Sequence, residues 1–145
     1  MLSKSMHFPF EGVNPNGKFY KICDDMKTSA AWQSLNRSQR CLYHELKSKF
    51  IVKKVKGRII YENSRNISFT TSEAQKLYGE LRTFRSDVDK LIECGFIDCI
   101  ESGYTTRTAS IYGFAERWKS YGKPGYEVPY QMMRPKTFRN KKNAK

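Results

Sequence analysis

Residues 70–100 read TTSEAQKLYGELRTFRSDVDKLIECGFIDCI, and this stretch decides the fold. Thr70 and Glu73 have the spacing of a capping box, which predicts a helix that runs through Tyr78 and stops at Gly79. A second helix is predicted from about Thr83 to Gly95, because apolar residues recur on one helical face at Phe84, Val88, Leu91 and Ile92. Residues 96–100 then have the composition of a strand. The order is therefore helix, short turn, helix, strand.

Further elements are predicted upstream of this stretch. Asn36 and Gln39 form a second capping-box pattern, and the helix that follows carries Leu42, Tyr43, Leu46 and Phe50 on one face. Residues 29–35 suit a short helix that turns Trp32 and Leu35 inward. Short strands are expected at residues 19–22 and 67–69, and a strand or extended edge at 58–61, after a local charge cluster at 53–56 and a turn at Gly57.

Downstream, the polar and turn-rich residues 102–108 are followed by residues 109–114, which can return as a strand beside 96–100. Residues 116–121 suit one or two helical turns. Together these elements predict an α+β fold, a winged helix-turn-helix with a C-terminal β-hairpin wing and flexible termini. The expected organisation is a flexible arm at 1–17, a winged-helix DNA-binding domain at 18–121 and a basic tail at 122–145.

The chain has 145 residues, which suits one domain, and a net charge of +13. Such an excess of Lys and Arg favours an acidic partner, while an aromatic content of 14% is too high for a disordered polycation. No apolar run is long enough to cross a bilayer, and the first residues lack the apolar core of a signal peptide. A cytoplasmic protein without membrane association is therefore expected.

Catalysis has little support in the sequence, which lacks a phosphate-binding loop, a nucleophile elbow and an HExxH zinc motif. His44 is expected on a helix surface, and Asp24 and Asp25 at the start of a short helix. The four cysteines contain no CxxC pair and are expected to be buried free thiols rather than metal ligands. We therefore expect no enzyme activity, no cofactor and no metal site.

Candidate DNA-binding residues fall in three segments. Guanidinium, ammonium and hydroxyl groups can reach phosphate oxygens or base edges, although the same residue types also cover ordinary solvated helix surfaces. The second helix supplies Arg82, Thr83, Arg85, Ser86 and Lys90, the wing supplies Tyr104, Thr105, Thr106 and Arg107, and the tail supplies Arg134, Lys136, Arg139, Lys141 and Lys142. Asp87, Asp89 and Glu93 on the same helix would repel phosphates, so contact is expected at its N-terminal end.

Residues 18–121 also resemble a known group of proteins. The motifs that carry the resemblance are Tyr20–Ile22, Ser29–Trp32, Leu35–Asn36, Leu42–Tyr43, Ile67–Phe69, Leu91–Ile97 and Tyr112–Phe114 with Trp118. Their order is similar to that of small bacterial winged-helix proteins of plasmids, conjugative elements and prophages. Some of these resemble replication initiators, and others look like transcriptional regulators or DNA-processing accessories. The resemblance implies that Arg82, Thr83, Arg85 and Ser86 read the DNA. Gln75 departs from the small alanine that is usual at its position.

The sequence thus predicts a non-catalytic protein of a mobile element that binds double-stranded DNA in replication, transcription control or DNA processing. A second hypothesis is a protein-interaction adaptor that exposes part of Trp32, Tyr43 or Trp118 to its partner. A third is an RNA-binding protein, although no aromatic motif of the RNP type is present. Whether the chain forms a homodimer or binds a protein partner is left open.

Overall fold

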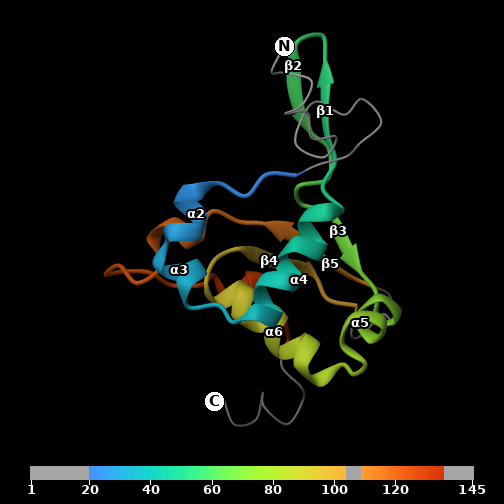
Figure 1. Ribbon diagram of the computed structural model, residues 1–145, viewed down its shortest axis with the longest axis vertical. Coiled ribbons are helices and arrows are strands. Elements are labelled where there is room, and N and C mark those ends of the chain that lie inside the picture. The colour runs from blue at the N-terminus through green and yellow to red at the C-terminus, as the bar shows by residue number, and fades with distance from the viewer. Residues whose placement is uncertain (1–19, 104–108, 136–145) are drawn as a thin grey trace, which may run out of the picture.

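The computed structural model describes residues 20–103 and 109–135. The described residues form a mixed α+β fold with five α-helices and two small antiparallel sheets (Figure 1). The elements are α2 (Asp24–Thr28), α3 (Ala30–Gln33), α4 (Arg37–Ser48), β1 (Val52–Val55), β2 (Arg58–Tyr61), β3 (Ile67–Phe69), α5 (Thr71–Tyr78), α6 (Arg82–Glu93), β4 (Ile97–Glu101), β5 (Ser110–Phe114) and the 3-10 helices η1 (Arg117–Ser120) and η2 (Tyr130–Met132). None of the helices in this part of the chain is long and apolar enough to cross a bilayer.

Both predicted capping boxes are formed. The side chain of Asn36 accepts a hydrogen bond from the backbone N–H of Gln39, whose own side chain accepts from the backbone N–H of Asn36. Thr70 and Glu73 make the same reciprocal pair at the start of α5. Each box satisfies two of the backbone donors that a helix N-terminus leaves without partners, so both helices begin where the sequence predicts.

Three strands form one sheet in the order β3-β5-β4. Strand β5 is central and runs antiparallel to both neighbours, with Tyr112 opposite Ile67 on one side and Cys99 on the other. The predicted pairing of residues 96–100 with 109–114 is therefore confirmed. A shift in register between Cys99 and Glu101 bends β4 as it approaches the connection to β5.

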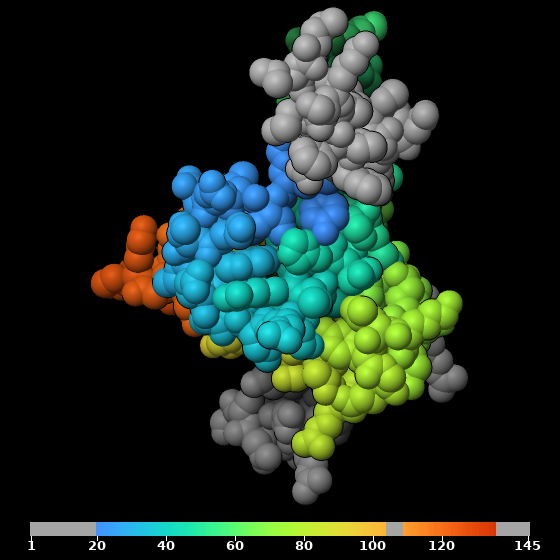
Figure 2. All heavy atoms as spheres, in the orientation of Figure 1, coloured from blue at the N-terminus to red at the C-terminus, as the bar shows by residue number. Residues whose placement is uncertain are grey.

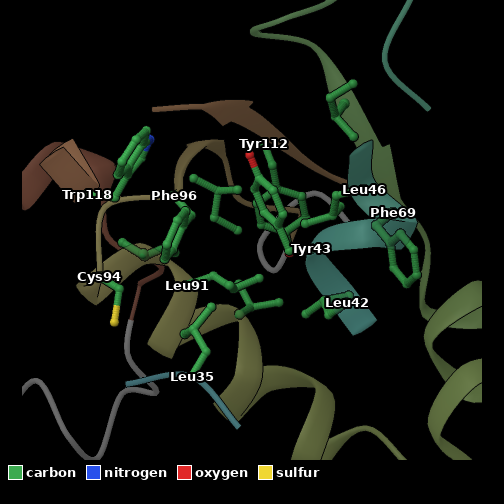
Figure 3. Close-up of a cluster of buried hydrophobic side chains, with 14 of the residues drawn as sticks. Leu35, Leu42, Tyr43, Leu46, Phe69, Leu91, Cys94, Phe96, Tyr112 and Trp118 are labelled. Carbon is green, nitrogen blue, oxygen red and sulfur yellow. The ribbon is translucent and has the colours of Figure 1, made fainter. Parts of the chain in front are cut away.

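The hydrophobic core lies between α4, α6 and the three-stranded sheet (Figure 3). Phe96 is completely buried, and its ring lies 5.4 to 6.2 Å from the rings of Tyr43, Trp32 and Trp118. Aromatic rings at these separations add to the stabilisation that burial of their area provides. Trp32, Tyr43 and Trp118 are all buried, with exposed fractions of 5%, 1% and 9%. The expectation that an adaptor surface would expose one of them is therefore wrong.

A buried acid joins the sheet to the segment after it. Asp98 of β4 is 5% exposed and accepts hydrogen bonds from Arg117 of η1 and, at 2.7 Å, from Nη1 of Arg65. Arg117 also donates to the backbone oxygen of Ile92 at 3.0 Å. A carboxylate in this position is tolerated because two guanidinium groups replace its hydration. The contacts fix η1 and the β2–β3 connection to the core.

Two local expectations are wrong. Residues 20–22 are not a strand: they pair with no described strand, and the hydroxyl of Tyr20 is instead bonded to Nδ1 of His44 on α4 at 2.8 Å. Cys23 and Cys41 are exposed, whereas Cys94 and Cys99 are buried. Cys41 lies on the solvent side of α4, since the face with Leu42, Tyr43 and Leu46 points into the core. His44 is exposed as predicted.

The segment after η1 also differs from the free tail that its composition suggested. Residues 122–135 contact the domain: the hydroxyl of Tyr126 donates to the backbone oxygen of Glu93 at 2.5 Å, and Val128 packs against the core. Arg134 binds Asp89 on α6. The apolar residues of this segment pack on the domain, which the composition of the segment alone does not predict. Residues 1–17 and 136–145, predicted to be flexible, lie outside the described residues.

Candidate nucleic-acid interface

The first turn of α6 carries the predicted reading residues on its surface. Arg82, Thr83, Arg85 and Ser86 are all exposed, while Phe84 of the same turn is buried in the core. Neither arginine forms an ion pair with another described residue. In Figure 2, α5 and the start of α6, in yellow-green, together form the lower right corner of the molecule. Two guanidinium groups thus extend from one corner of the fold.

Glu80 occupies the N-terminus of α6. Its Oε1 accepts a hydrogen bond of 3.0 Å from the backbone N–H of Thr83 and a second one from the Thr83 hydroxyl. These hydrogen bonds from Thr83 are the main reason that the pKa of Glu80 is lowered. The hydroxyl of Thr83 is therefore engaged within the chain, and Arg82, Arg85 and Ser86 are the predicted residues of this turn that offer side chains to a ligand.

Asp87 points into the molecule rather than toward a ligand. It is 2% exposed, and its Oδ2 accepts hydrogen bonds from the hydroxyl of Ser38 and, at 2.7 Å, from that of Tyr78. Burial and the hydrogen bond to Asp87 both raise the pKa of Tyr78. The three side chains join α4, α5 and α6. The carboxylate of Asp87 thus fixes the orientation of α6 and presents no negative charge at the surface.

Asp89 is neutralised by the segment that follows the domain. Nε and Nη2 of Arg134 donate to Oδ1 and Oδ2 of Asp89, each at 2.9 Å. This is the two-pronged geometry that guanidinium and carboxylate groups favour. Arg134, which we expected in a free arm against DNA, therefore holds an acid on α6 instead.

Lys90 is partly buried, and its Nζ lies 3.8 Å from Oε2 of Glu93 in the last turn of the helix. It is thus set apart from the first-turn arginines, with an acid as its neighbour. Every acid of α6 is therefore buried, bonded to Arg134 or placed beside Lys90. The repulsion of phosphates that the sequence suggested is therefore reduced along α6, and Glu80, beside Arg82, is the acid that remains exposed at its N-terminus.

Eight of the predicted DNA-binding residues lie in the predicted wing and at the end of the tail. Tyr104, Thr105, Thr106 and Arg107 lie outside the described residues, as do Lys136, Arg139, Lys141 and Lys142. The structure shows β4 and β5, the strands on either side of residues 104–108, and the backbone N–H of Gly103 donates to Oγ of Ser110 at 3.0 Å.

The structure also reveals a cationic element that the sequence analysis did not assign to function. Strands β1 and β2 pair as a hairpin, with Val52 opposite Tyr61 and Val55 opposite Arg58. All eight strand residues are exposed. In the sequence, the charge cluster at 53–56 and the turn residue Gly57 indicate this hairpin. Strand β1 lacks the alternation of apolar and polar residues that identifies a half-buried strand.

The described residues contain no group of three His, Cys, Asp or Glu side chains that could hold a metal ion. Comparison of the chain with protein-family models, with curated proteins and with solved structures found no match in any of the three. The function of the chain therefore has to be inferred from its own residues and their geometry.

Proposed function

We propose that the chain is a winged-helix protein that binds double-stranded DNA without catalysing a reaction. In this fold, α5 and α6 are the helix-turn-helix, α6 enters the major groove, and β4 and β5 carry the wing. The element order from α4 to β5, with β3 at the edge of the sheet and β5 at its centre, supports the assignment. So does Gly79, whose φ of 77° ends α5 three residues before α6 begins.

One observation carries the proposal. The first turn of α6 presents Arg82 and Arg85 to solvent, while Asp87 is buried beneath it and Asp89, one turn beyond Arg85, is paired with Arg134. A helix that is merely solvated can leave its carboxylates exposed. In the major groove, exposed carboxylates would be repelled by the phosphates. The net charge of +13 supports an acidic partner of the same kind.

The resemblance to winged-helix proteins of plasmids, conjugative elements and prophages supports a role in a mobile element, in replication, transcription control or DNA processing. The adaptor hypothesis required an exposed aromatic residue to contact the partner, and Trp32, Tyr43 and Trp118 are all buried. No feature of the described residues favours RNA over duplex DNA.

The proposal is tested by selecting bound sequences from a random duplex pool, with the wild-type chain and with R82A/R85A. The wild-type chain should enrich a defined site, and palindromy in that site would indicate a dimer. Loss of a base-reading arginine should cost about 1 to 3 kcal/mol of binding free energy and relax one position of the site. K21Q/K27Q is a control that also removes two cations, both at exposed positions away from α6. If R82A/R85A and wild type select the same site with the same affinity, α6 does not read DNA.

A further inference from the structure

The β1–β2 hairpin projects from the body of the protein, at the end of the molecule opposite α5 and the start of α6 (Figure 1). Its root is fixed to the Phe114 end of β5, because the backbone N–H of Phe114 donates to the oxygen of Ser64 at 2.8 Å. The wing leaves β5 at the other end, beyond Ser110. The hairpin therefore lies at the opposite end of β5 from the proposed wing.

The hairpin is firmly mounted. The side chain of Asn63 accepts a hydrogen bond from the backbone N–H of Ile51 at 2.7 Å and donates one to the backbone oxygen of Lys49 at 2.9 Å. These two hydrogen bonds close the base of the hairpin. The rings of Phe50 and Tyr61 stack with centroids 6.0 Å apart, and Phe50 contacts Phe114 of the core at 5.1 Å. At the tip, Lys56 and Gly57 have φ of 51° and 79°, as a tight turn matched to the strand twist requires. These contacts anchor the base of the hairpin on the core, and its exposed strands extend from there as an arm.

Both faces of the arm carry cations among apolar side chains. The pairing places Val52, Lys54, Ile59 and Tyr61 on one face and Lys53, Val55, Arg58 and Ile60 on the other. Lys53 pairs with Glu62 at 3.1 Å, whereas Lys54, Lys56 and Arg58 make no ion pair within the described part of the chain. The exposed fraction of Ile59 is 60% and that of Tyr61 is 59%, so the arm offers apolar contact area as well as charge.

The distribution of charge and apolar area on the arm favours one class of partner over the others. A second copy of the hairpin would bring like charges together. A bilayer surface favours a segregated apolar face, which the arm lacks because each face has a cation. A peptide added along one strand edge would meet only part of the charge. A duplex groove has phosphates on both walls, and the major groove admits a two-stranded ribbon between them.

We propose that the β1–β2 hairpin is a second contact site for duplex DNA, separate from the surface formed by α6 and the wing. Its cations on both faces meet the two phosphate walls of a groove, and Ile59 and Tyr61 pack against sugars and base edges inside it. Because the two sites lie at opposite ends of the molecule, one copy of the chain can hold two duplex segments. The inference extends the proposed DNA binding and rests on it for its partner.

The test measures affinity for a random-sequence duplex at several salt concentrations. The hairpin variant is K54Q/K56Q/R58Q, and the matched control is K21Q/K27Q/K123Q, which removes the same charge from exposed positions elsewhere. Each triple is made in wild type and in R82A/R85A. Each neutralised phosphate contributes about 0.9 to the slope of log affinity against log salt, so the hairpin triple should lower the slope by about 2 to 3 units in both backgrounds. The control triple should lower it by less than about one.

Equal slopes for the hairpin triple and the control triple would overturn the second site, whatever R82A/R85A does. Conversely, if R82A/R85A selects and binds DNA as wild type does, the reading role of α6 fails while the hairpin result stands. A wild-type chain that binds no duplex overturns both proposals. The last measurement uses vesicles that contain phosphatidylserine. If the hairpin triple weakens binding to these vesicles but not to DNA, the partner of the hairpin is a membrane surface and the proposal of a second duplex site is overturned. Circular dichroism confirms that each variant is folded.

Discussion

Arg134 and Asp89 lie 45 positions apart in the chain, and the guanidinium of the first donates two hydrogen bonds of 2.9 Å to the carboxylate of the second. The contact ties the segment after the domain to the solvent side of the proposed recognition helix. It also gives Arg134 a role that differs from the direct phosphate contact expected for it. The two roles make different predictions.

If Arg134 acts by neutralising Asp89, R134A should weaken duplex binding because it leaves a bare carboxylate on α6. D89A/R134A should then bind like the wild-type chain, since the pair and its double replacement carry the same net charge. The measurement is a double-mutant cycle of DNA affinity. A loss in R134A that D89A fails to relieve would instead place Arg134 on the DNA. Because Asp89 is about half exposed, the coupling in the free energy of unfolding should stay below about 1 kcal/mol.

Buried tyrosines make the fold sensitive to alkali. Burial raises the pKa of Tyr112 to about 12, and burial also raises the pKa of Tyr43. In the unfolded chain a tyrosine ionises near its ordinary pKa of about 10. The folded state keeps the proton above that pH, so stability from these groups is complete below about pH 10 and is lost as pH rises from 10 toward 12.

Tyr112→Phe removes one ionisable group whose pKa differs between the folded and the unfolded state. The fall of unfolding free energy with pH should therefore become shallower by up to about 1 kcal/mol per pH unit between pH 10 and 12. Urea denaturation at several pH values measures the slope. Tyr130→Phe is the control, because Tyr130 is 79% exposed and should leave the slope as it is in wild type. Equal slopes for Tyr112→Phe and wild type would show that Tyr112 ionises while folded.

Two glycines that end helices differ in what surrounds them. A Cβ at Gly95 would lie 2.5 Å from the backbone nitrogen of Trp118 and 2.6 Å from the carbonyl carbon of Arg117, whereas a Cβ at Gly79 would have no neighbour within 4 Å. Both residues have a positive φ, which costs an alanine about 1 to 2 kcal/mol. We expect that loss for G79A, and about 2 to 5 kcal/mol for G95A because η1 must also move. Similar midpoints in urea for the two variants would contradict the close packing of η1 on α6.

The sequence predicts the elements whose signals are local. Two residues three apart, Asn36 with Gln39 and Thr70 with Glu73, are enough to place the start of a helix, because both partners of each capping box lie in one turn. The first turn of α6 is predictable for the same reason: one apolar stripe determines which side faces solvent. Strand β3 was found with the limits that the structure shows.

Contacts between distant residues could not be predicted in this way. Nothing near Asp87 indicates that Tyr78 and Ser38 will bury it, and nothing near Arg134 indicates that it will bind Asp89. Strand β1 was missed because both of its faces are exposed, so no alternation of apolar and polar residues marks it. In each case the decisive information is which surfaces meet in the folded chain.

The segment after η1 divides into two parts that should act differently. Residues 122–135 contact α6 and the core through Tyr126, Val128 and Arg134, whereas residues 136–145 contain five cations and no acid. Deletion of 136–145 should leave thermal stability unchanged. If about four of these cations lie on phosphates, it should also lower the slope of log affinity against log salt by about 3 to 4 units.

Deletion of 122–145 should lower the slope by a similar amount and, in addition, reduce stability by about 1 to 3 kcal/mol, because the apolar contacts of Val128 and its neighbours are lost. Thermal melting and salt titration of both truncated chains separate the two effects. The sequence preference of the site should survive in each, since α6 is intact. A salt slope that stays at the wild-type value after removal of 136–145 would show that these cations do not contact DNA, and equal melting temperatures for the two deletions would show that residues 122–135 contribute nothing to the stability of the fold.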